Sequence, residues 1–345
     1  MEKELWQYLK TVKKPIVLYG MGNGADKIIK VLDEYGISFE GVFASDGFVR
    51  DKTFHGHKIS TYNELKERFG EMIVLLCFGS ARSEVISNVR RISAENELYA
   101  PEVPVIGGGL FTEKYVNDNK ADFEWVYNHL ADDLSRKTFE NTVNFKLSGK
   151  IDYLFDCETD EDEPYESFFK LTDSESFLDL GAYKGDTVAD FVSRVSGYSK
   201  ITAVEGDSKT FLKLCRNTAG YKNTECKNLC ISSFCGEAPF GMKHGRNSAA
   251  FAGETKAQFT TVDALLEGQE STFIKMDIEG EEKNAILGAA CTVKNFKPKM
   301  LISCYHRTED LISIPKTVFS LRDDYRIYIR HLNGLPAWDT NYYFI

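Results

Sequence analysis

The stretch Phe177-Leu178-Asp179-Leu180-Gly181-Ala182-Tyr183-Lys184-Gly185-Asp186-Thr187 decides the fold. A short apolar run ends in a turn with two glycines, and an amphipathic segment follows, which predicts a strand, a tight turn and the start of a helix. Twenty residues past Gly185, Glu205 ends a second apolar run. Glycine lets a ligand approach the backbone closely, and an acid at this spacing can bind both hydroxyls of a ribose. The pattern therefore predicts a site for a nucleoside-containing cofactor.

The glycine spacing in this turn departs from the dinucleotide fingerprint. Asp179, Gly181 and Gly185 follow a D-x-G-x-x-x-G pattern, whereas G-x-G-x-x-G would place its second glycine where Tyr183 stands. A tyrosine there would crowd a pyrophosphate, but S-adenosylmethionine contains none. The turn therefore favours S-adenosylmethionine, and the alternative is that it only joins a strand to a helix.

Length and composition describe an ordinary globular protein. The chain has 345 residues, enough for two domains, of which 43% are hydrophobic and 27% are charged. A net charge of −10 argues against a nucleic-acid partner, which would require a basic surface. The longest apolar run, 72–78, is too short to cross a bilayer, and the first residues lack the apolar core of a signal peptide. We therefore expect a cytoplasmic protein without a membrane span.

The 8 cysteines raise the question of a metal site. Cys215, Cys226, Cys230 and Cys235 cluster in the sequence, but they lack the two-residue gaps of a zinc site and have no histidine close by. We expect no metal there.

Two Rossmann-like α/β units are predicted, at 1–110 and 166–345. In the first unit, buried strands alternate with helical patterns, which is typical of a parallel, doubly wound sheet. Between the units, 111–165 is predicted to be a helical connector that ends in an acidic loop. We interpret the acidic run 156–164 as solvated and mobile. The expected strands of the first unit are 15–19, 39–44 and 72–78.

The first unit has a glycine turn of its own. Gly20, Gly22, Asn23 and Gly24 follow its first strand and open a helix, and Asp46 stands where a ribose-binding acid would be expected. This pattern predicts a second nucleotide site, for NAD(P) or a nucleotide-sugar. Because no catalytic set accompanies the motif, we rank a scaffolding or carrier-binding role above a dehydrogenase.

The second unit is predicted to end differently from a dehydrogenase. No helical pattern separates its last two strands, so we expect them to pair antiparallel. A Rossmann-like sheet with an antiparallel last strand is the class I methyltransferase variant. The predicted strands are 177–180, 201–205, 228–232, 273–277, 300–304, 325–331 and 341–345.

Several segments of this unit, taken together and in order, resemble the FkbM family of methyltransferases. The resemblance runs from about Phe177 to Ile345 and implies a class I S-adenosylmethionine-dependent methyltransferase that usually acts on an oxygen of sugars or natural products. The segments are 177–186, Ala203-Val204-Glu205-Gly206-Asp207, 260–266, Phe273-Ile274-Lys275-Met276-Asp277-Ile278-Glu279-Gly280, Ser303-Cys304-Tyr305-His306, Glu309-Asp310-Leu311 and Ile314-Pro315.

The resemblance also implies roles for single residues. The methionine and ribose side of the cofactor would be lined by Asp179, Gly181, Ala182, Tyr183 and Gly185, although the family usually has a small polar residue where Tyr183 stands. Glu205 and Gly206 would hold the ribose, and Asp207 and Ser232 would lie near the adenine. Asp277 would face the methyl donor or acceptor. Glu282 is expected to favour the helix dipole from the first helical turn rather than to catalyse, and Glu279 is undecided between the two roles.

A hydroxyl acceptor benefits from a base, and His306 and Asp277 are the catalytic candidates. His306 should follow the fifth strand at the carboxyl edge, where such sites lie, and the alternative is a structural histidine. Asp277 could instead bind a metal with Glu279, but the sequence offers no clear third ligand and we favour metal-free chemistry. The polar, glycine-rich segment 241–253 is interpreted as a substrate loop or a hairpin tip.

The sequence thus favours methyl transfer from S-adenosylmethionine to a hydroxyl of a sugar or glycoconjugate. The alternatives are an NAD(P)-dependent sugar-nucleotide-modifying enzyme that uses the first unit, and a non-catalytic nucleotide-binding adaptor. The expected partner is a small-molecule or glycan substrate. The sequence does not decide whether the chain forms a homo-oligomer.

Overall fold

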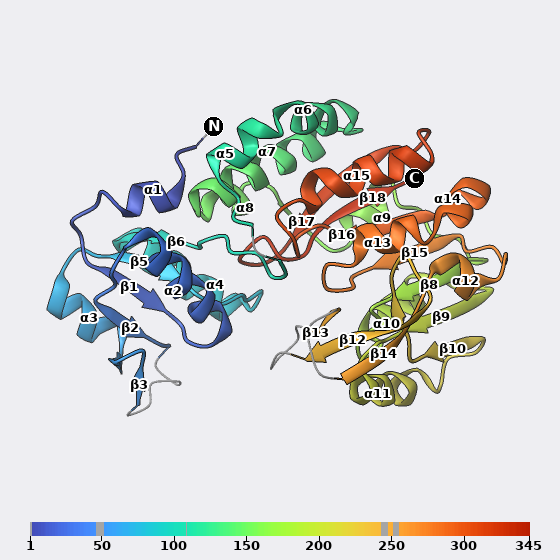
Figure 1. Ribbon diagram of the computed structural model, residues 1–345, viewed down its shortest axis with the longest axis horizontal. Helices are drawn as coiled ribbons and strands as arrows, with labels where there is room; N and C mark the ends of the chain where they lie inside the picture. Colours follow the sequence, from blue (N-terminus) through green and yellow to red (C-terminus); the bar gives the residue numbers. More distant parts are fainter. Residues whose placement is uncertain (1, 46–51, 108, 243–247, 251–254) are drawn as a thin grey trace.

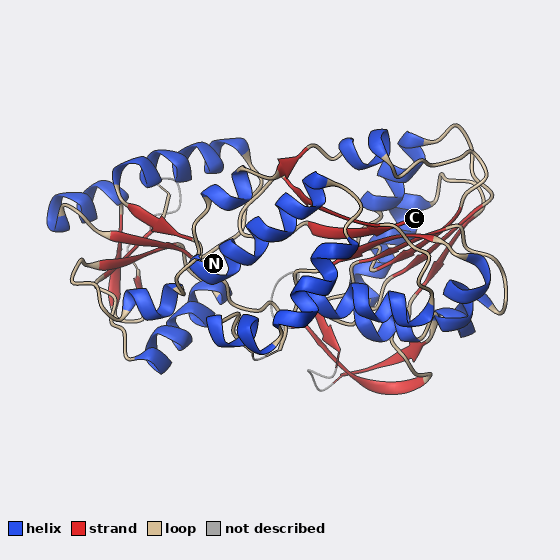
Figure 2. Ribbon diagram, turned by 90° about the horizontal axis from the view of Figure 1, so that it is seen from above, coloured by secondary structure: helices blue, strands red, loops and turns tan. Residues whose placement is uncertain are grey.

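The computed structural model describes residues 2–45, 52–107, 109–242, 248–250 and 255–345. Figure 1 shows two α/β units side by side, the N-terminal one in blue and the C-terminal one in yellow to red, with green helices lying above and between them. Figure 2 shows that each unit has a sheet of its own. The chain therefore has a mixed α/β fold with parallel sheets.

The first sheet has the strand order β3-β4-β2-β1-β5-β6. Its centre is β1 (Ile16–Tyr19), which pairs in parallel with β2 (Gly41–Phe43) and β5 (Ile73–Leu76). All residues of these strands are buried, since alternate side chains of β1 enter two different cores. The other elements are α1 (Leu5–Leu9), α2 (Asn23–Tyr35), β3 (Thr53–Phe54), β4 (His57–Ser60), α3 (Tyr62–Phe69), α4 (Ser83–Glu95) and β6 (Glu97–Tyr99).

Helix α7 (Asp133–Ser148) ties the two units together. Its Phe139 belongs to the core of the second unit and its Phe145 to a core of the first. The helix therefore has an apolar contact on each side, which a flexible linker would lack. It is accompanied by α5 (Glu113–Asp118), α6 (Lys120–His129) and α8 (Asp152–Phe155).

The acidic run is only partly the loop that we predicted: residues 160–162 are exposed, but a strand and the start of a helix lie within the run. Its β7 (Glu158–Thr159) pairs with β17 (Ile327–Leu332), and α9 (Glu163–Ser167) follows. Oε2 of Glu163 accepts a hydrogen bond of 2.6 Å from Nε of Arg330, whose side chain is 1% exposed. A buried guanidinium is stable only beside an anionic partner, so this ion pair holds part of the acidic run against the fold.

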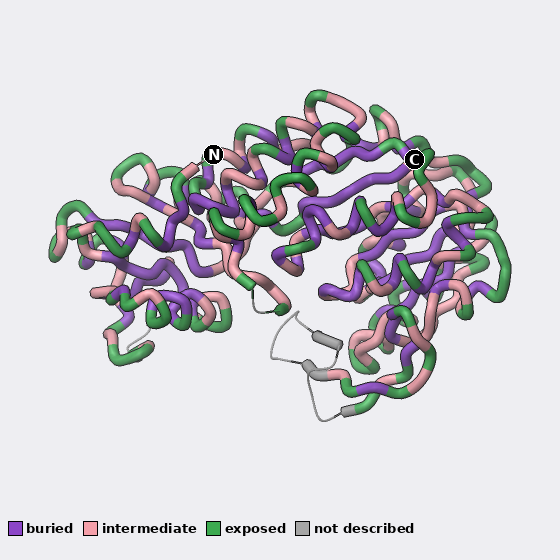
Figure 3. Tube along the Cα trace, turned by 45° about the horizontal axis from the view of Figure 1, so that its top comes forward, coloured by how far each residue is buried: buried purple, intermediate pink, exposed green. Residues whose placement is uncertain are grey.

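The second sheet has the order β10-β9-β8-β15-β16-β18-β17-β7. As predicted, its last strand is antiparallel, pairing with both β16 and β17. Figure 3 shows buried stretches of the chain, in purple, running through the interior of the molecule. The elements are β8 (Ser176–Leu180), α10 (Asp186–Arg194), β9 (Lys200–Val204), α11 (Ser208–Thr218), β10 (Thr224–Lys227), α12 (Val262–Leu266), β15 (Phe273–Met276), α13 (Glu282–Leu287), α14 (Ala290–Phe296), β16 (Lys299–Ser303), α15 (Asp310–Leu321) and β18 (Thr340–Phe344).

The prediction that 228–232 forms a strand of the second sheet is wrong. The strand beside β9 is the half-exposed β10, and the chain leaves the sheet at Asn228, whose Nδ2 donates to the carbonyl oxygens of Glu205 and Gly206 at 2.8 and 3.1 Å. The apolar run that suggested a strand forms β11 (Cys230–Ile231) in a separate sheet. That sheet has the order β11-β14-β12-β13, with β12 (Gly236–Met242), β13 (Ser248–Ala250) and β14 (Thr255–Thr260).

The register of the second sheet aligns the carboxyl ends of its central parallel strands, and with them the loops that carry the candidate site residues. Leu180 lies opposite both Val204 and Met276, and Met276 lies opposite Ile302. The loops that begin at Gly181, Glu205, Asp277 and Cys304 therefore leave the same carboxyl edge, where ligands bind in parallel α/β sheets.

The two units also contact each other through this edge. The backbone N–H of Ile106 donates to the carbonyl of His306 at 2.9 Å, and Ser80 forms an antiparallel bridge with Leu335. Within the described ranges, no helix combines the length and apolar character that a bilayer span requires.

Candidate active site

A cavity of about 310 Å³ lies at the carboxyl edge of the second sheet. One part of its wall is apolar and includes Ile231, Phe240 and Phe259 from the small sheet. Another part is acidic and includes Asp277 and Glu279 from the loop after β15. The cavity therefore suits a ligand with an apolar ring at one end and cationic or hydroxyl groups at the other.

Gly181 allows two loops of the site to touch. A Cβ atom at this position would lie 1.8 Å from the carbonyl oxygen of Asp277, and its φ of +80° is in the left-handed region. Only glycine meets both conditions without strain. The glycine that the sequence singled out is therefore required for the loop after β8 to pass directly beside the loop after β15.

Glu205 is held by the backbone at the rim of the cavity. Its Oε2 accepts from the N–H of Tyr183 at 3.0 Å and its Oε1 from the N–H of Asp207 at 2.7 Å. Burial raises the pKa of this carboxyl, and the two backbone hydrogen bonds oppose the rise. The carboxylate is thus fixed in orientation and still reaches the cavity, as a ribose-binding acid must.

Lys275 is a site residue that the sequence interpretation missed. It lines the cavity from the middle of β15, with its Nζ 3.3 Å from Oδ1 of Asp179 and donating to the carbonyl of Gly181 at 2.9 Å. Burial opposes the charge of its amino group, but the Asp179 and Asp277 carboxylates outweigh it and raise the pKa. A lysine inside an otherwise apolar strand was the available signal, since a buried cation requires a buried anion.

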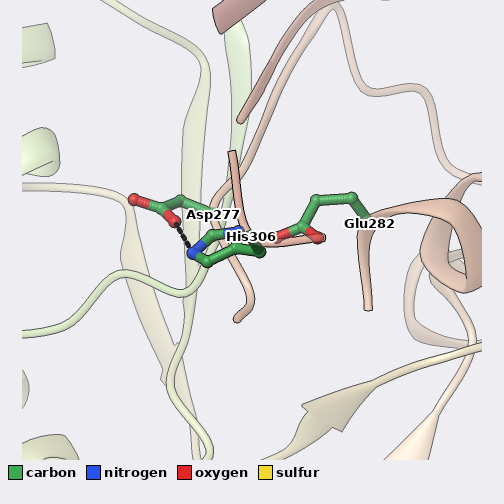
Figure 4. A group of neighbouring side chains, drawn as sticks. All are labelled: Asp277, Glu282 and His306. Atoms are coloured by element: carbon green, nitrogen blue, oxygen red, sulfur yellow. Dashed lines mark ion pairs between the residues drawn. The ribbon is translucent and has the colours of Figure 1, made fainter. Parts of the chain in front are cut away.

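The acidic end of the cavity is built around His306. The ring lies between Asp277 and Glu282, as Figure 4 shows, with Nε2 3.4 Å from Oδ1 of Asp277 and Nδ1 3.0 Å from Oε1 of Glu282. Its Nε2 also lies 3.6 Å from Oε2 of Glu279. Tyr305, the preceding residue, donates from its hydroxyl to Asp277 at 3.2 Å.

These neighbours control the charge of the site. Burial disfavours a protonated His306, but the carboxylates of Glu282, Asp277 and Glu279 outweigh it and raise the pKa of the ring to about 10. Burial raises the pKa of Glu279 to about 7, against the opposing effect of His306. At neutral pH the site therefore holds an imidazolium cation beside a carboxyl group that is about half ionised.

Glu282 has contacts beyond the favourable interaction with the helix dipole that we expected. It does begin α13, but its side chain is 0% exposed, and its Oε1 accepts from the backbone N–H of Ile278 at 2.9 Å and of Gly280 at 3.3 Å. Together with its ion pair to His306, these contacts make it the anchor of the loop after β15. Nothing in the sequence around Glu282 indicated that its side chain would point inward.

Asp277, Glu282 and His306 offer three ligand atoms within 4.8 Å of one another, the one such group among the described residues. Both carboxylates of this group lie at ion-pair distance from a nitrogen of the His306 ring, at 3.4 Å for Asp277 and 3.0 Å for Glu282. The arrangement is that of an ion-paired histidine.

The predicted cofactor residues divide into two sets. Gly181, Tyr183, Glu205, Gly206, Asp207 and Asp277 line the cavity. The lining does not include Asp179, Ala182, Gly185 and Ser232; Oγ of Ser232, for example, donates to Oε2 of Glu281 at 2.8 Å. His306 also stays behind the wall, since its side chain is 1% exposed and the residues that line the cavity do not include it.

Two of the three glycines in the first unit's turn are required for close packing. A Cβ at Gly24 would lie 2.2 Å from the carbonyl oxygen of Cys77, and one at Gly20 would lie 2.5 Å from the ring of Phe78. Gly22 has open space around it and, with a φ of +102°, forms the N-cap before α2, which begins at Asn23. Asp46 and most of the segment 241–253 lie outside the described residues.

The comparisons with known proteins agree with this geometry. The family model of the Methyltransferase FkbM domain matches residues 179–329, which lie in the second unit. The chain is similar in structure to a Methyltransferase FkbM from Methylobacillus flagellatus, with a TM-score of 0.75 and 21% identity over 96% of this chain and 90% of that one. The shared fold therefore extends over both units.

More distant similarities cover half of the chain. A fibrillarin from Aeropyrum pernix, in complex with natively bound S-adenosyl-L-methionine, matches 50% of this chain and 67% of its own with 13% identity and a TM-score of 0.33. An rRNA methylase from Streptococcus thermophilus matches 50% of this chain and 87% of its own with 13% identity and a TM-score of 0.34. Among the curated proteins, none matches the chain.

Proposed function

We propose that the chain is an S-adenosylmethionine-dependent methyltransferase that methylates a hydroxyl group of a sugar or glycoconjugate. The observation that carries the proposal is the single cavity that joins the Gly181 turn, Glu205 and the acidic loop at Asp277, inside the FkbM domain. The alternative that uses NAD(P) in the first unit gains no support from the comparisons.

The residues present fit this cofactor. The apolar wall at Ile231, Phe240 and Phe259 suits an adenine, and Glu205 is oriented to accept from ribose hydroxyls. The carboxylates of Asp277 and Glu279 suit a cationic sulfur at the other end. When bound, S-adenosylmethionine supplies a methyl group that is already activated by the positive charge on its sulfur.

The protein's own contribution is placement and proton transfer. The loops after β8 and β15 meet at Gly181 and hold the two halves of the site in one position, which favours an in-line approach of the acceptor. Tyr305 and Asp339 line the same cavity and are suited to hydrogen bonding with the hydroxyls of an acceptor. Of the two residues that the sequence suggested as catalytic, Asp277 lines the cavity, whereas His306 lies behind its wall.

For the first unit we propose a scaffolding role, with domain boundaries near residues 110 and 165. Its connection to the site supports this role, because Ile106 hydrogen-bonds the backbone of His306 and α7 packs into both units. The acceptor class is proposed from the hydroxyl-binding character of the cavity wall.

Titration calorimetry with S-adenosylhomocysteine tests the cofactor, and methyl transfer from labelled S-adenosylmethionine to a panel of methyl glycosides and nucleotide-sugars tests the acceptor. We expect the wild type and the control variant Glu225→Gln, changed on the half-exposed β10, to bind S-adenosylhomocysteine equally. A folded wild type that binds neither S-adenosylhomocysteine nor S-adenosylmethionine would overturn the proposal.

A further inference from the structure

The position of the His306 ring determines what it can do with protons. Each of its nitrogens lies close to a carboxylate, Nδ1 at 3.0 Å from Oε1 of Glu282 and Nε2 at 3.4 Å from Oδ1 of Asp277. A ring nitrogen without a hydrogen would bring its lone pair close to a negative charge, which is unfavourable. Both nitrogens are therefore expected to carry hydrogen, and a ring in that state has no lone pair with which to accept a proton.

The location of the ring leads to the same conclusion. His306 is 1% exposed and lies behind the cavity wall, while Asp277 and Glu279 form the wall in front of it. An acceptor hydroxyl in the cavity would meet these carboxylates before it could reach the imidazole. A base must come within hydrogen-bond reach of the proton it removes.

Of the two carboxylates, Glu279 has fewer contacts with other side chains. Both oxygens of Asp277 lie within hydrogen-bond reach of the Tyr305 hydroxyl, at 3.2 and 3.4 Å, and its Oδ1 also faces His306. Among the described residues, the partner found for the Glu279 side chain is His306, at 3.6 Å from Oε2. The side chain is 26% exposed on the cavity side, so an oxygen is available to an acceptor.

The backbone holds Glu279 in place under strain. Its φ is +54°, in the left-handed region that a glutamate rarely adopts, and Gly280 follows with a φ of +89°. Oε1 of Glu282 accepts from the N–H groups on both sides of Glu279, and Nε of Arg307 donates to the carbonyl of Gly280 at 2.6 Å. A strained backbone conformation persists only where surrounding contacts hold it in place, and such conformations are concentrated at functional sites.

We propose that Glu279 accepts the proton of the acceptor hydroxyl and that His306 is a positioning residue, the cation that orients Glu279 and Asp277 toward the cavity. The inference rests on the proposed function. As the oxygen of the acceptor forms its bond to the methyl carbon, the carbon–sulfur bond breaks and its electron pair stays on sulfur. The hydroxyl proton passes to Oε of Glu279 and leaves to solvent after the product departs.

The charges around Glu279 suit this role. His306 faces it with a positive charge, while Asp277, Glu282 and Glu205 contribute negative charge. Behind the ring, burial raises the pKa of Asp310, whose Oδ2 accepts from the N–H of Arg307 at 2.8 Å. Burial and these anions keep the pKa of Glu279 at about 7, which is favourable for a base that must accept a proton near neutral pH and then release it.

Two measurements on the cofactor-free protein test the assignment. In ¹⁵N NMR, we expect both ring nitrogens of His306 to show imidazolium shifts through about pH 8.5. In infrared difference spectra, we expect a protonated-carboxyl band that titrates near neutral pH in the wild type and is missing in Glu279→Gln. A His306 ring that is neutral at pH 7 would overturn the proposal.

Turnover and binding then separate this inference from the proposed function. With S-adenosylmethionine and a methyl glycoside that the wild type accepts, Glu279→Gln should lose roughly a hundredfold or more in kcat, while its affinity for S-adenosylhomocysteine stays within about threefold. His306→Gln should raise KM as well as lower kcat, because the carboxylates lose their orientation. Glu309→Gln, at an exposed position beside α15, is the matched control.

The outcomes are distinguishable. If S-adenosylhomocysteine binds but Glu279→Gln keeps full turnover, the inference fails and the proposed function stands. If the wild type does not bind S-adenosylhomocysteine, the proposed function fails. If Glu279→Gln does not fold, Glu279→Asp, which withdraws the carboxylate by one methylene, is used in its place and should lose turnover in the same direction.

Discussion

Nδ1 of His306 lies 3.0 Å from Oε1 of Glu282, and the exposed fraction of neither side chain exceeds 1%. This ion pair is buried beneath the cavity rather than open to it. Because Glu282 also accepts from the backbone of the loop after β15, the pair connects the β16–α15 loop to the segment that carries Asp277 and Glu279. The site is therefore held by buried electrostatics, and the first predictions concern that pair.

Replacing His306 with alanine should destabilise the fold by about 3–5 kcal/mol, because Glu282 would lose its counter-ion while staying buried. Urea unfolding at neutral pH measures the loss. Adding Glu282→Gln to this variant should recover part of it, since the amide oxygen can still accept from Ile278 and Gly280 without a charge. His55→Ala, which removes an exposed pair with Asp26, is the control. Equal stabilities of wild type and His306→Ala would contradict the ion pair.

Glu279→Gln should change the stability of the protein in a pH-dependent way. The folded-state pKa of about 7 is above the ordinary 4.5, so protonation of Glu279 stabilises the fold. That contribution is fully present below pH 4.5 and is lost as the pH rises through 7. Since glutamine resembles the protonated carboxyl, the variant should exceed the wild type in unfolding free energy at about pH 8.5, by at most about 3 kcal/mol, and match it near pH 4. A constant difference across this range would count against the raised pKa.

Glu205→Gln should weaken the binding of S-adenosylhomocysteine without unfolding the protein. Hydrogen bonds from ribose hydroxyls to a charged acceptor are worth about 1.5–3 kcal/mol, which corresponds to a loss of roughly 10- to 150-fold in affinity. Calorimetry measures the change, with Glu225→Gln as the control on the neighbouring strand. Unchanged affinity in a folded Glu205→Gln would place the ribose elsewhere.

Gly181→Ala should disrupt both stability and cofactor binding. The new Cβ would collide with the carbonyl of Asp277 and would also demand a positive φ from alanine. We expect a loss of more than about 1 kcal/mol in unfolding free energy, together with weaker binding of S-adenosylhomocysteine. Gly220→Ala is the matched control, because nothing lies within 4 Å of its Cβ position and it has no positive φ. A fully stable Gly181→Ala would show that the two loops can separate without cost.

Much of the fold was predictable because it depends on local patterns. Continuous apolar runs gave the central strands, and glycine turns marked where helices begin after β1 and β8. The antiparallel last strand followed from the missing helix before 340–344. The strand at 228–232 was misplaced, since β10 is a half-exposed edge strand with a weak apolar signal. Which of two nearby runs joins a sheet depends on partners far away in the sequence.

The composition of the site was also partly predictable. Gly181, Glu205 and Asp277 follow directly after buried strands, and parallel strands deliver such residues to one edge. Lys275 was missed although a lysine inside an apolar strand is unusual. Its partner Asp179 is far away in the sequence and lies beside it only in the folded sheet. His306 was identified as chemically important, but nothing in its local sequence indicated which atoms its ring would face.

Local sequence patterns were sufficient to predict the strands and turns, the antiparallel end of the second sheet and the residues at its carboxyl edge, because these follow from periodicity and glycine conformation within short segments. The position of His306 behind the cavity wall, between Glu282 and Asp277, and that of Glu279 at the cavity became known from the folded structure. The protonation state of a group depends on burial and on charges brought from α13, β15 and β16, and that environment exists only after the elements have packed.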